Sequence, residues 1–235
     1  MLVAFAQEFG IAAGTTRVAL SRMVERRELA RDDDGTYELR GPLLERQRRQ
    51  EAGLAPITRP WNGDWEIHVV RTGGRGSGDR AALRRAARRL GLRERRDGVW
   101  LRPDNLDPDR LPNERAILAR QADRFLGAPA EGIDPRGLAA ELFDLDAWAS
   151  VADELGAAID EMIVAFDDDP DAPLAAGFVL AAEVLRHLVA DPLLPPRLCP
   201  AGWPAPRLRA AYRDYDAAYR QRLSAFFRSR SRLTR

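Results

Sequence analysis

The spacing of apolar residues divides the N-terminal part of the chain into short amphipathic elements. Residues 2–9 (LVAFAQEF) are apolar enough to predict a short buried helix, and Gly10 ends that segment. A second helix is predicted over residues 16–27, because apolar side chains gather on one side of its helical wheel. These side chains are Ala19, Leu20, Met23 and Val24. The pattern therefore predicts two helices joined by a tight connection.

Directly after this helix the spacing of apolar residues changes from the helical period to a period of two. Residues 28–40 (ELARDDDGTYELR) alternate around an Asp-Gly pair, which predicts a β-hairpin. Helix, tight turn, helix and hairpin follow one another in the order of a winged helix-turn-helix. Two interpretations remain open. Either helix 16–27 enters a DNA groove, or the segment is a structural helix and hairpin without a nucleic-acid partner.

The middle of the chain has a different pattern. Residues 65–70 (WEIHVV) predict a strand, residues 80–90 a helix, and residues 92–103 two further strands around Asp97-Gly98. The apolar stripe of the helix consists of Leu83, Ala86, Ala87 and Leu90. This βαββ order predicts a small ferredoxin-like α+β domain.

Beyond residue 103 most segments show the apolar spacing of helices. We therefore expect a mainly α-helical chain with α+β parts, in four regions. They are a winged helix-turn-helix head at 1–50, a linker at 51–60, a ferredoxin-like domain at 61–107 and a helical domain at 108–235.

Charge changes this picture only through its distribution. The 235 residues carry a net charge of +1, which by itself indicates no polyanionic partner. Residues 51–103, however, carry 12 arginines against 6 acidic residues, and no basic residue of the chain is a lysine. Arginine forms bidentate contacts with carboxylate, phosphate and guanine, although a GC-rich genome also explains its abundance.

Several polar side chains of the head are candidates for DNA contacts. Either Thr15 or Thr16 suits the N-cap of helix 16–27. Arg17, Ser21, Arg22 and Arg26 lie outside its apolar side, while three consecutive aspartates, Asp32 to Asp34, argue against a wing tip on phosphates. The candidate DNA-binding residues are Thr15, Thr16, Arg17, Ser21, Arg22, Arg26, Arg31 and Arg40.

Helix 80–90 projects arginines on the side opposite its apolar stripe. Such a face binds phosphates of DNA or of an anionic ligand, or it is simply a solvated surface. Arg84, Arg85 and Arg88 are weak candidates for binding an effector, whose site is otherwise unknown.

Nothing in the sequence points to catalysis. We find no nucleophile elbow, HExxH motif, P-loop or Ser/His/Asp order, and expect His68 and His187 to be structural. One cysteine, Cys199, excludes an internal disulfide framework, and no Cys/His pair has metal-ligand spacing. We therefore expect no enzyme, metal or cofactor. Without a secretory signal or a long apolar run, the protein is expected to be cytoplasmic.

Three stretches together resemble the phenylacetic-acid degradation repressor (PaaX) family of bacterial transcription regulators. The first is FGIAAGTTRVALSRMVERRELARDDDGTYEL, the second RPWNGDWEIHVV with RLGLRERRDGVWLRPDNL, and the third LFDLDAWA with DPLLPPRLCPAGWPAPRLRAAY. Taken together in this order, the three stretches cover essentially the whole chain.

The resemblance implies a homodimer that binds a double-stranded DNA operator and represses a catabolic operon. An aryl-acyl-CoA effector such as phenylacetyl-CoA would release it. Arg17, Ser21 and Arg22 match the Arg-x-x-x-Ser-Arg positions of the family's reader helix.

Two departures from the family keep an alternative open. The family's head begins with a further helix, which the present sequence lacks before Met1, and the Asp-rich wing is less basic than expected. The alternative is a protein-interaction module of the same fold that has lost DNA binding. A nuclease related to the small ferredoxin-like CRISPR enzymes is unsupported, because Arg71 follows the first central strand where those enzymes carry a carboxylate.

Overall fold

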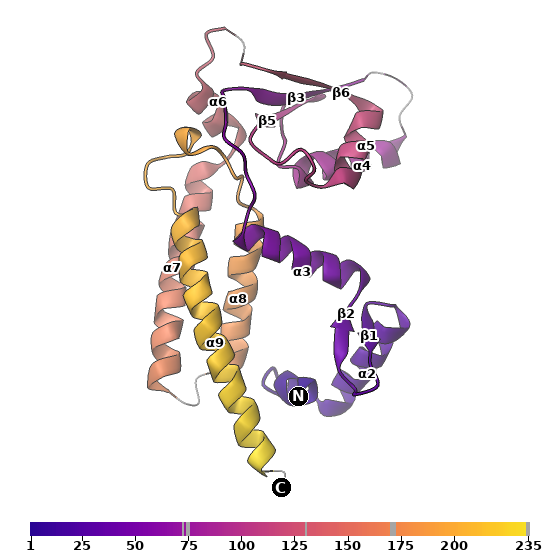
Figure 1. The fold of residues 1–235 in the computed structure, drawn as a ribbon, viewed down its shortest axis with the longest axis vertical. Helices are drawn as coiled ribbons and strands as arrows, with labels where there is room; N and C mark the ends of the chain where they lie inside the picture. The colour runs from indigo at the N-terminus through magenta and orange to yellow at the C-terminus, as the bar shows by residue number, and fades with distance from the viewer. Residues whose placement is uncertain (72, 74–75, 130, 170–172, 234–235) are drawn as a thin grey trace. The chain divides into compact units, whose positions relative to one another are not determined.

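The computed structural model describes residues 1–71, 73, 76–129, 131–169 and 173–233 (Figure 1). Helices and small antiparallel sheets alternate along the chain, which confirms a helical protein with α+β parts. The chain divides into two compact units. Unit 1 comprises residues 1–55, 149–191 and 204–235, and unit 2 comprises residues 56–148 and 192–203.

Unit 1 begins with the head. The head consists of α1 (Leu2–Gln7), α2 (Ala13–Glu25), the hairpin strands β1 (Leu29–Arg31) and β2 (Tyr37–Leu39), and α3 (Gly41–Leu54). The hairpin pairs Leu29 with Leu39 and Arg31 with Tyr37 around the Asp-Gly turn, so that prediction is confirmed. The expected burial of residues 2–9 is wrong in degree, because no residue of α1 is fully buried.

Three long helices form the rest of unit 1. They are α7 (Leu145–Asp168), most of which lies in this unit, α8 (Leu174–Val189) and α9 (Ala205–Leu233). Aromatic rings join them, since Phe166 of α7 lies 6.1 Å from Tyr215 and 5.9 Å from Tyr219 of α9, between ring centroids. The Tyr215 hydroxyl donates a 2.6 Å hydrogen bond to the carbonyl of Gly177 in α8. No described helix of either unit is long and apolar enough to span a bilayer.

Gly177 allows this close approach because it has no side chain. A Cβ atom there would lie 2.8 Å from Cζ of Phe166 and 2.9 Å from Cε2 of Tyr219.

We expect Gly177→Ala to lower the free energy of unfolding by about 1–3 kcal/mol through overpacking. Gly156→Ala is the matched control, since a Cβ at this position of α7 meets nothing within 4 Å. There the better helix propensity of alanine should raise stability by about 0.5–1 kcal/mol, as urea unfolding would measure. Equal effects of both substitutions would contradict this packing.

Unit 2 is built on a four-stranded antiparallel sheet in the order β4-β5-β3-β6. Its elements are β3 (Trp65–Val70), α4 (Ser77–Arg89), β4 (Arg93–Arg96), β5 (Val99–Pro103), α5 (Pro112–Gln121) and β6 (Ala122–Gly127). The sheet thus continues past residue 107, and β6 pairs with β3 along the other edge from β5.

The two faces of this sheet are covered by different elements. Trp100 belongs to a core with Leu83 and Leu118, so α4 and α5 pack on its face (Figure 1). The next residue of β5, Leu101, points to the opposite face and packs with α6 (Pro135–Leu142) and the 3-10 helix η1 (Pro196–Leu198). The predicted apolar stripe of α4 is confirmed, because its four residues are all buried.

Candidate nucleic-acid interface

Helix α2 packs one side against its neighbours in the head. Leu20, Met23 and Val24 are half-buried there, and Thr16 is the one described residue of α2 that is fully buried. Ala19, which the wheel had placed on the apolar side, is exposed. The packed side therefore keeps three of the four predicted residues, and Thr16 takes the place of Ala19.

The predicted N-cap at Thr15 or Thr16 is wrong. Ala12 is the N-cap, and both threonines lie within the first turn or just after it. The Thr16 hydroxyl instead donates to the Ala12 carbonyl at 3.2 Å, a contact to residue i−4 that threonine makes inside helices. Thr16 is therefore a buried structural residue of the head and is not exposed for a contact with DNA.

The other side of α2 presents polar side chains to solvent. Its remaining candidates are exposed, namely Thr15, Arg17, Ser21, Arg22 and Arg26. By helical spacing Arg17 and Ser21 lie along one edge of this face, and Thr15, Arg22 and Arg26 lie along the other. None of the three arginines forms an ion pair with any residue that the structure describes. Their guanidinium groups are therefore available to an anionic partner.

Sequence reasoning missed Val18, which lies between these two edges and is 52% exposed. An apolar side chain at this place matches the thymine methyl group that the major groove presents. On the helical wheel Val18 is an apolar residue outside the apolar side of the helix, and this mismatch is the signal that would have revealed it. Glu25 also lies on this face and is unfavourable near phosphates.

The hairpin holds its own charged residues in place. Asp32 accepts hydrogen bonds from the backbone N–H and the hydroxyl of Thr36, and these bonds lower the pKa of Asp32. Arg40 lies 2.5 Å from Glu38, and Arg31 lies 6.0 Å above the ring of Tyr37. Both arginines are exposed, but Arg40 is already paired with a carboxylate. Arg31 is thus the better candidate for a phosphate contact.

The head contacts the long helices through α3, and through α1 with the residues just after it, rather than through the outer face of α2. In α3, the carbonyl of Gly53 accepts a 2.8 Å hydrogen bond from Arg209 of α9. Phe178 of α8 packs edge-to-face with Phe5 and Phe9, at centroid distances of 5.7 and 5.6 Å. Arg230 of α9 lies 2.9 Å from Glu8. The candidate residues on α2 take no part in these contacts.

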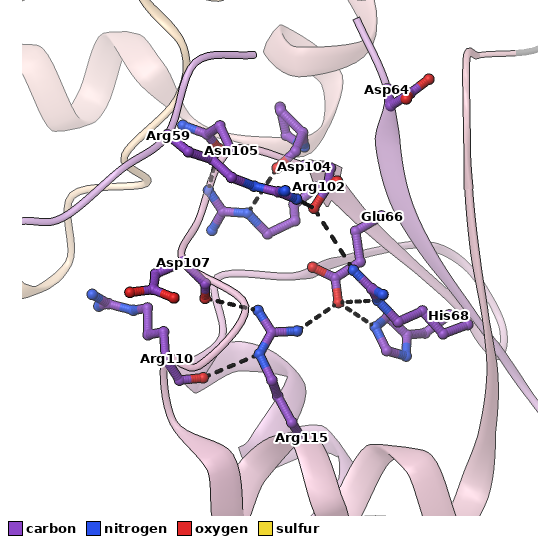
Figure 2. A network of polar contacts seen from close by, with 12 residues as sticks. Arg59, Asp64, Glu66, His68, Arg102, Asp104, Asn105, Asp107, Arg110 and Arg115 are labelled. Carbon is purple, nitrogen blue, oxygen red and sulfur yellow. Dashed lines mark hydrogen bonds and ion pairs between the residues drawn. The ribbon is translucent and has the colours of Figure 1, made fainter. Parts of the chain in front are cut away.

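A polar network of unit 2 surrounds Glu66, whose side chain is 4% exposed (Figure 2). Its Oε1 atom lies 2.8 Å from Nε2 of His68 on the same strand, and 3.0 Å from both Arg115 of α5 and Arg124 of β6. Burial alone would raise the pKa of Glu66. The hydrogen bond from His68 and the charges of Arg115 and Arg124 outweigh burial and lower this pKa to about 2.

This network joins elements of the unit and does not expose a reactive group. Glu66 connects β3, α5 and β6, while Asp104 pairs with Arg59 and lies 3.7 Å from Arg124. Arg71, after β3, pairs with Asp123 at 2.7 Å and donates to the Ala119 carbonyl. The carboxylate of Glu66 therefore serves to hold the sheet and its helices together.

The weak effector candidates lie elsewhere. Arg84, Arg85 and Arg88 are exposed on the outer side of α4, and they face solvent rather than the core below them. Among the described residues no group of three His, Cys, Asp or Glu side chains could hold a metal ion.

Two comparisons with known proteins found a likeness. The family model described as PaaX-like protein C-terminal domain matches residues 143–229, which contain α7, α8, η1 and most of α9. The solved structure of the uncharacterized protein Rv0674 from Mycobacterium tuberculosis is similar to the chain, with a TM-score of 0.74 and 38% identity. That likeness covers 95% of this chain and 88% of the other. No curated protein matches the chain. The chain belongs to the PaaX-like family of transcriptional regulators.

Proposed function

We propose that this protein is a sequence-specific DNA-binding repressor whose head is a winged helix-turn-helix. Membership in the PaaX-like family supports regulation of transcription. The observation that carries the DNA-binding step is the outer face of α2, where Arg17, Arg22 and Arg26 are exposed and unpaired among the described residues. Helix α2 is the reader helix in this proposal, and Arg31 at the hairpin contacts the backbone.

The reading chemistry follows from the side chains on this face. Arginine matches O6 and N7 of guanine together, and Val18 matches the methyl group of thymine. Ser21 lies one turn beyond Arg17 and forms hydrogen bonds with a base edge or a phosphate. A single short helix of this kind binds too weakly for a specific site, so the repressor acts as a homodimer on two half-sites.

The remaining parts act as the sensor in this proposal. The ferredoxin-like unit and the helical domain respond to an aryl-acyl-CoA thioester, such as phenylacetyl-CoA, in the cytoplasm. Effector binding favours a dimer geometry in which the two heads no longer fit their half-sites. Effector binding and operator binding are thus linked through the geometry of the dimer. No catalytic step is part of this function.

Fluorescence anisotropy with the DNA upstream of the protein's own gene tests the proposal. The wild-type protein is expected to prefer this DNA to a random-sequence duplex. Arg17→Ala and Arg22→Ala should each reduce affinity about 5- to 150-fold, the cost of about 1–3 kcal/mol for one lost base contact. Arg213→Ala, an exposed arginine of α9, is the control and should leave affinity unchanged.

The same measurement decides between the proposal and the alternative. If the wild-type protein shows no preference for its upstream DNA, or both α2 variants bind as it does at physiological salt, DNA reading by α2 is excluded. The chain would then be an interaction module that keeps the fold without the DNA-binding activity.

A further inference from the structure

We infer that the outer side of α4 binds the phosphate backbone of duplex DNA, as a second contact that is independent of base sequence. This inference rests on the proposed DNA-binding function and assigns it a surface outside the head. The surface, called here the α4 arginine face, consists of Arg80, Arg84, Arg85 and Arg88, all of which are exposed.

The α4 arginine face carries no compensating carboxylate. Leu83, Ala86 and Ala87 bury the opposite side of the helix. Asp79 lies four residues before Leu83 and seven before Ala86, so helical geometry places it on their side rather than among the arginines. The outer side of α4 is therefore uniformly positive.

Like charges stand next to one another along this face. Arg80, Arg84 and Arg88 follow at intervals of four residues, a spacing at which like-charged side chains repel and destabilise a helix. Burial, aided by the charge of Arg88, lowers the pKa of Arg93 on the adjacent strand β4. None of the four arginines pairs with an acidic side chain in the part of the chain that the structure describes. A polyanion would relieve this repulsion.

Several exposed arginines on other helices have acidic partners, whereas those on the outer faces of α2 and α4 do not. Arg49 lies 3.9 Å from Glu45 on α3, Arg220 lies 2.7 Å from Asp216 on α9, and Arg207 lies 2.5 Å from Asp153 on α7. Even on α4, Arg89 lies 2.5 Å from Glu114. The four arginines of the α4 arginine face differ from these paired arginines in lacking acidic partners among the described residues.

The length of the face matches an extended anion. From Arg80 to Arg88 the helix rises about 12 Å. Duplex DNA presents one negative charge per about 1.7 Å of its axis, so several phosphates lie within this length. The side chains project from the exposed side of a helix instead of converging on a point. That arrangement fits a polymer backbone better than the few phosphates of a small effector.

The experiment measures binding of the full chain to a random-sequence duplex between about 50 and 200 mM salt. The test variant is Arg84→Gln/Arg85→Gln/Arg88→Gln. The control is Arg49→Gln/Arg207→Gln/Arg220→Gln, which removes the same three positive charges from paired positions. Net charge, and with it long-range steering, is thereby matched between the two variants.

We expect the test variant to lose about tenfold or more in affinity at about 100 mM salt. The slope of log affinity against log salt should become shallower by about 0.9 for each lost phosphate contact. The control variant should stay close to the wild type. The unfolding temperature of the test variant should equal or exceed that of the wild type, because like charges have been removed, and this measurement also shows that the variant folds.

Failure of this inference is distinct from failure of the proposed function. Absence of wild-type binding to the random duplex, or equal slopes for the two variants, overturns the role of the α4 arginine face. The proposed function is judged instead by preference for the upstream DNA over the random duplex. That preference should be unchanged in the test variant, since phosphate contacts carry no sequence information.

Discussion

Replacement of Glu66 by glutamine is expected to lower the free energy of unfolding by about 3–5 kcal/mol. The carboxylate is almost fully buried and contacts His68, Arg115 and Arg124 through one oxygen atom. Glutamine keeps the size of the side chain but removes its charge, which leaves the two guanidinium groups close together without an anion between them. Urea unfolding of the full chain measures the change.

A matched substitution separates the network from a general effect of lost charge. Glu141 lies 3.5 Å from Arg95, and its side chain is 54% exposed. Glu141→Gln should therefore change stability by less than about 1 kcal/mol, as expected for a solvent-screened pair. A similar loss in both variants would show that the Glu66 network does not stabilise unit 2.

The pH dependence of the Glu66→Gln effect follows from the low pKa of this residue. The folded protein holds the pKa of Glu66 at about 2, below its ordinary value of 4.5. Because the folded-state pKa is depressed, the stabilisation by the ionised group is fully present above about pH 5 and disappears as the pH falls toward 2. The linkage free energy involved is about 3 kcal/mol. The stability difference between wild type and variant should shrink over this interval.

Arg102→Met is expected to destabilise unit 2 by about 3–5 kcal/mol, although methionine fills a similar volume. Arg102 is 2% exposed and donates to the carbonyls of Leu90, Pro192 and Leu193 and to the side chain of Asn105. Burial lowers the pKa of Arg102 to about 9, so the group remains charged at neutral pH. The carbonyls of Leu90 and Pro192 lose this donor, which costs about 1–3 kcal/mol for each group left unsatisfied in the interior, whereas Asn105 still donates to the carbonyl of Leu193.

The control for Arg102 lies on the adjacent strand. Arg96 of β4 is exposed, and Arg96→Met should change stability by less than about 0.5 kcal/mol. Guanidinium chloride unfolding compares the two variants. Wild-type stability in Arg102→Met would mean that the carbonyls find other donors and that Arg102 does not hold the 192–193 segment in place.

Local patterns correctly predicted the elements whose geometry depends on near neighbours. The hairpin around Asp34-Gly35 forms as expected, because residue alternation and a turn that needs a positive φ at Gly35 suffice to specify it. The buried stripe of α4 is equally clear from a period of 3.6. In α2 the same method misplaced Ala19 and the N-cap, because a threonine inside the helix contributes to the buried side.

Among the candidate contacts, exposure on α2 was predictable and pairing was not. Arg17 and Arg22 were correctly placed outside the apolar side of the helix. Glu38 and Arg40 are two residues apart and therefore share one face of the extended segment, but alternation alone does not say that they form an ion pair. Base and phosphate contacts by these residues remain predictions.

The sequence by itself determined the helix, helix and hairpin order of the head, the βαββ order of residues 65–103, the absence of an internal disulfide framework and the family resemblance. Each of these is encoded in neighbouring residues or in composition. Strand β6 lies where helices were expected, and only its pairing with β3 in the structure revealed it. Only the tertiary structure decided which buried charges meet. Glu66 finds Arg115 and Arg124 at separations of 49 and 58 residues, and Arg102 reaches carbonyls 90 and 91 residues away. The pairing of distant strands, and the return of the chain to unit 2 at residues 192–203, bring these groups together. The free energies of their contacts depend on burial, which no local pattern reveals.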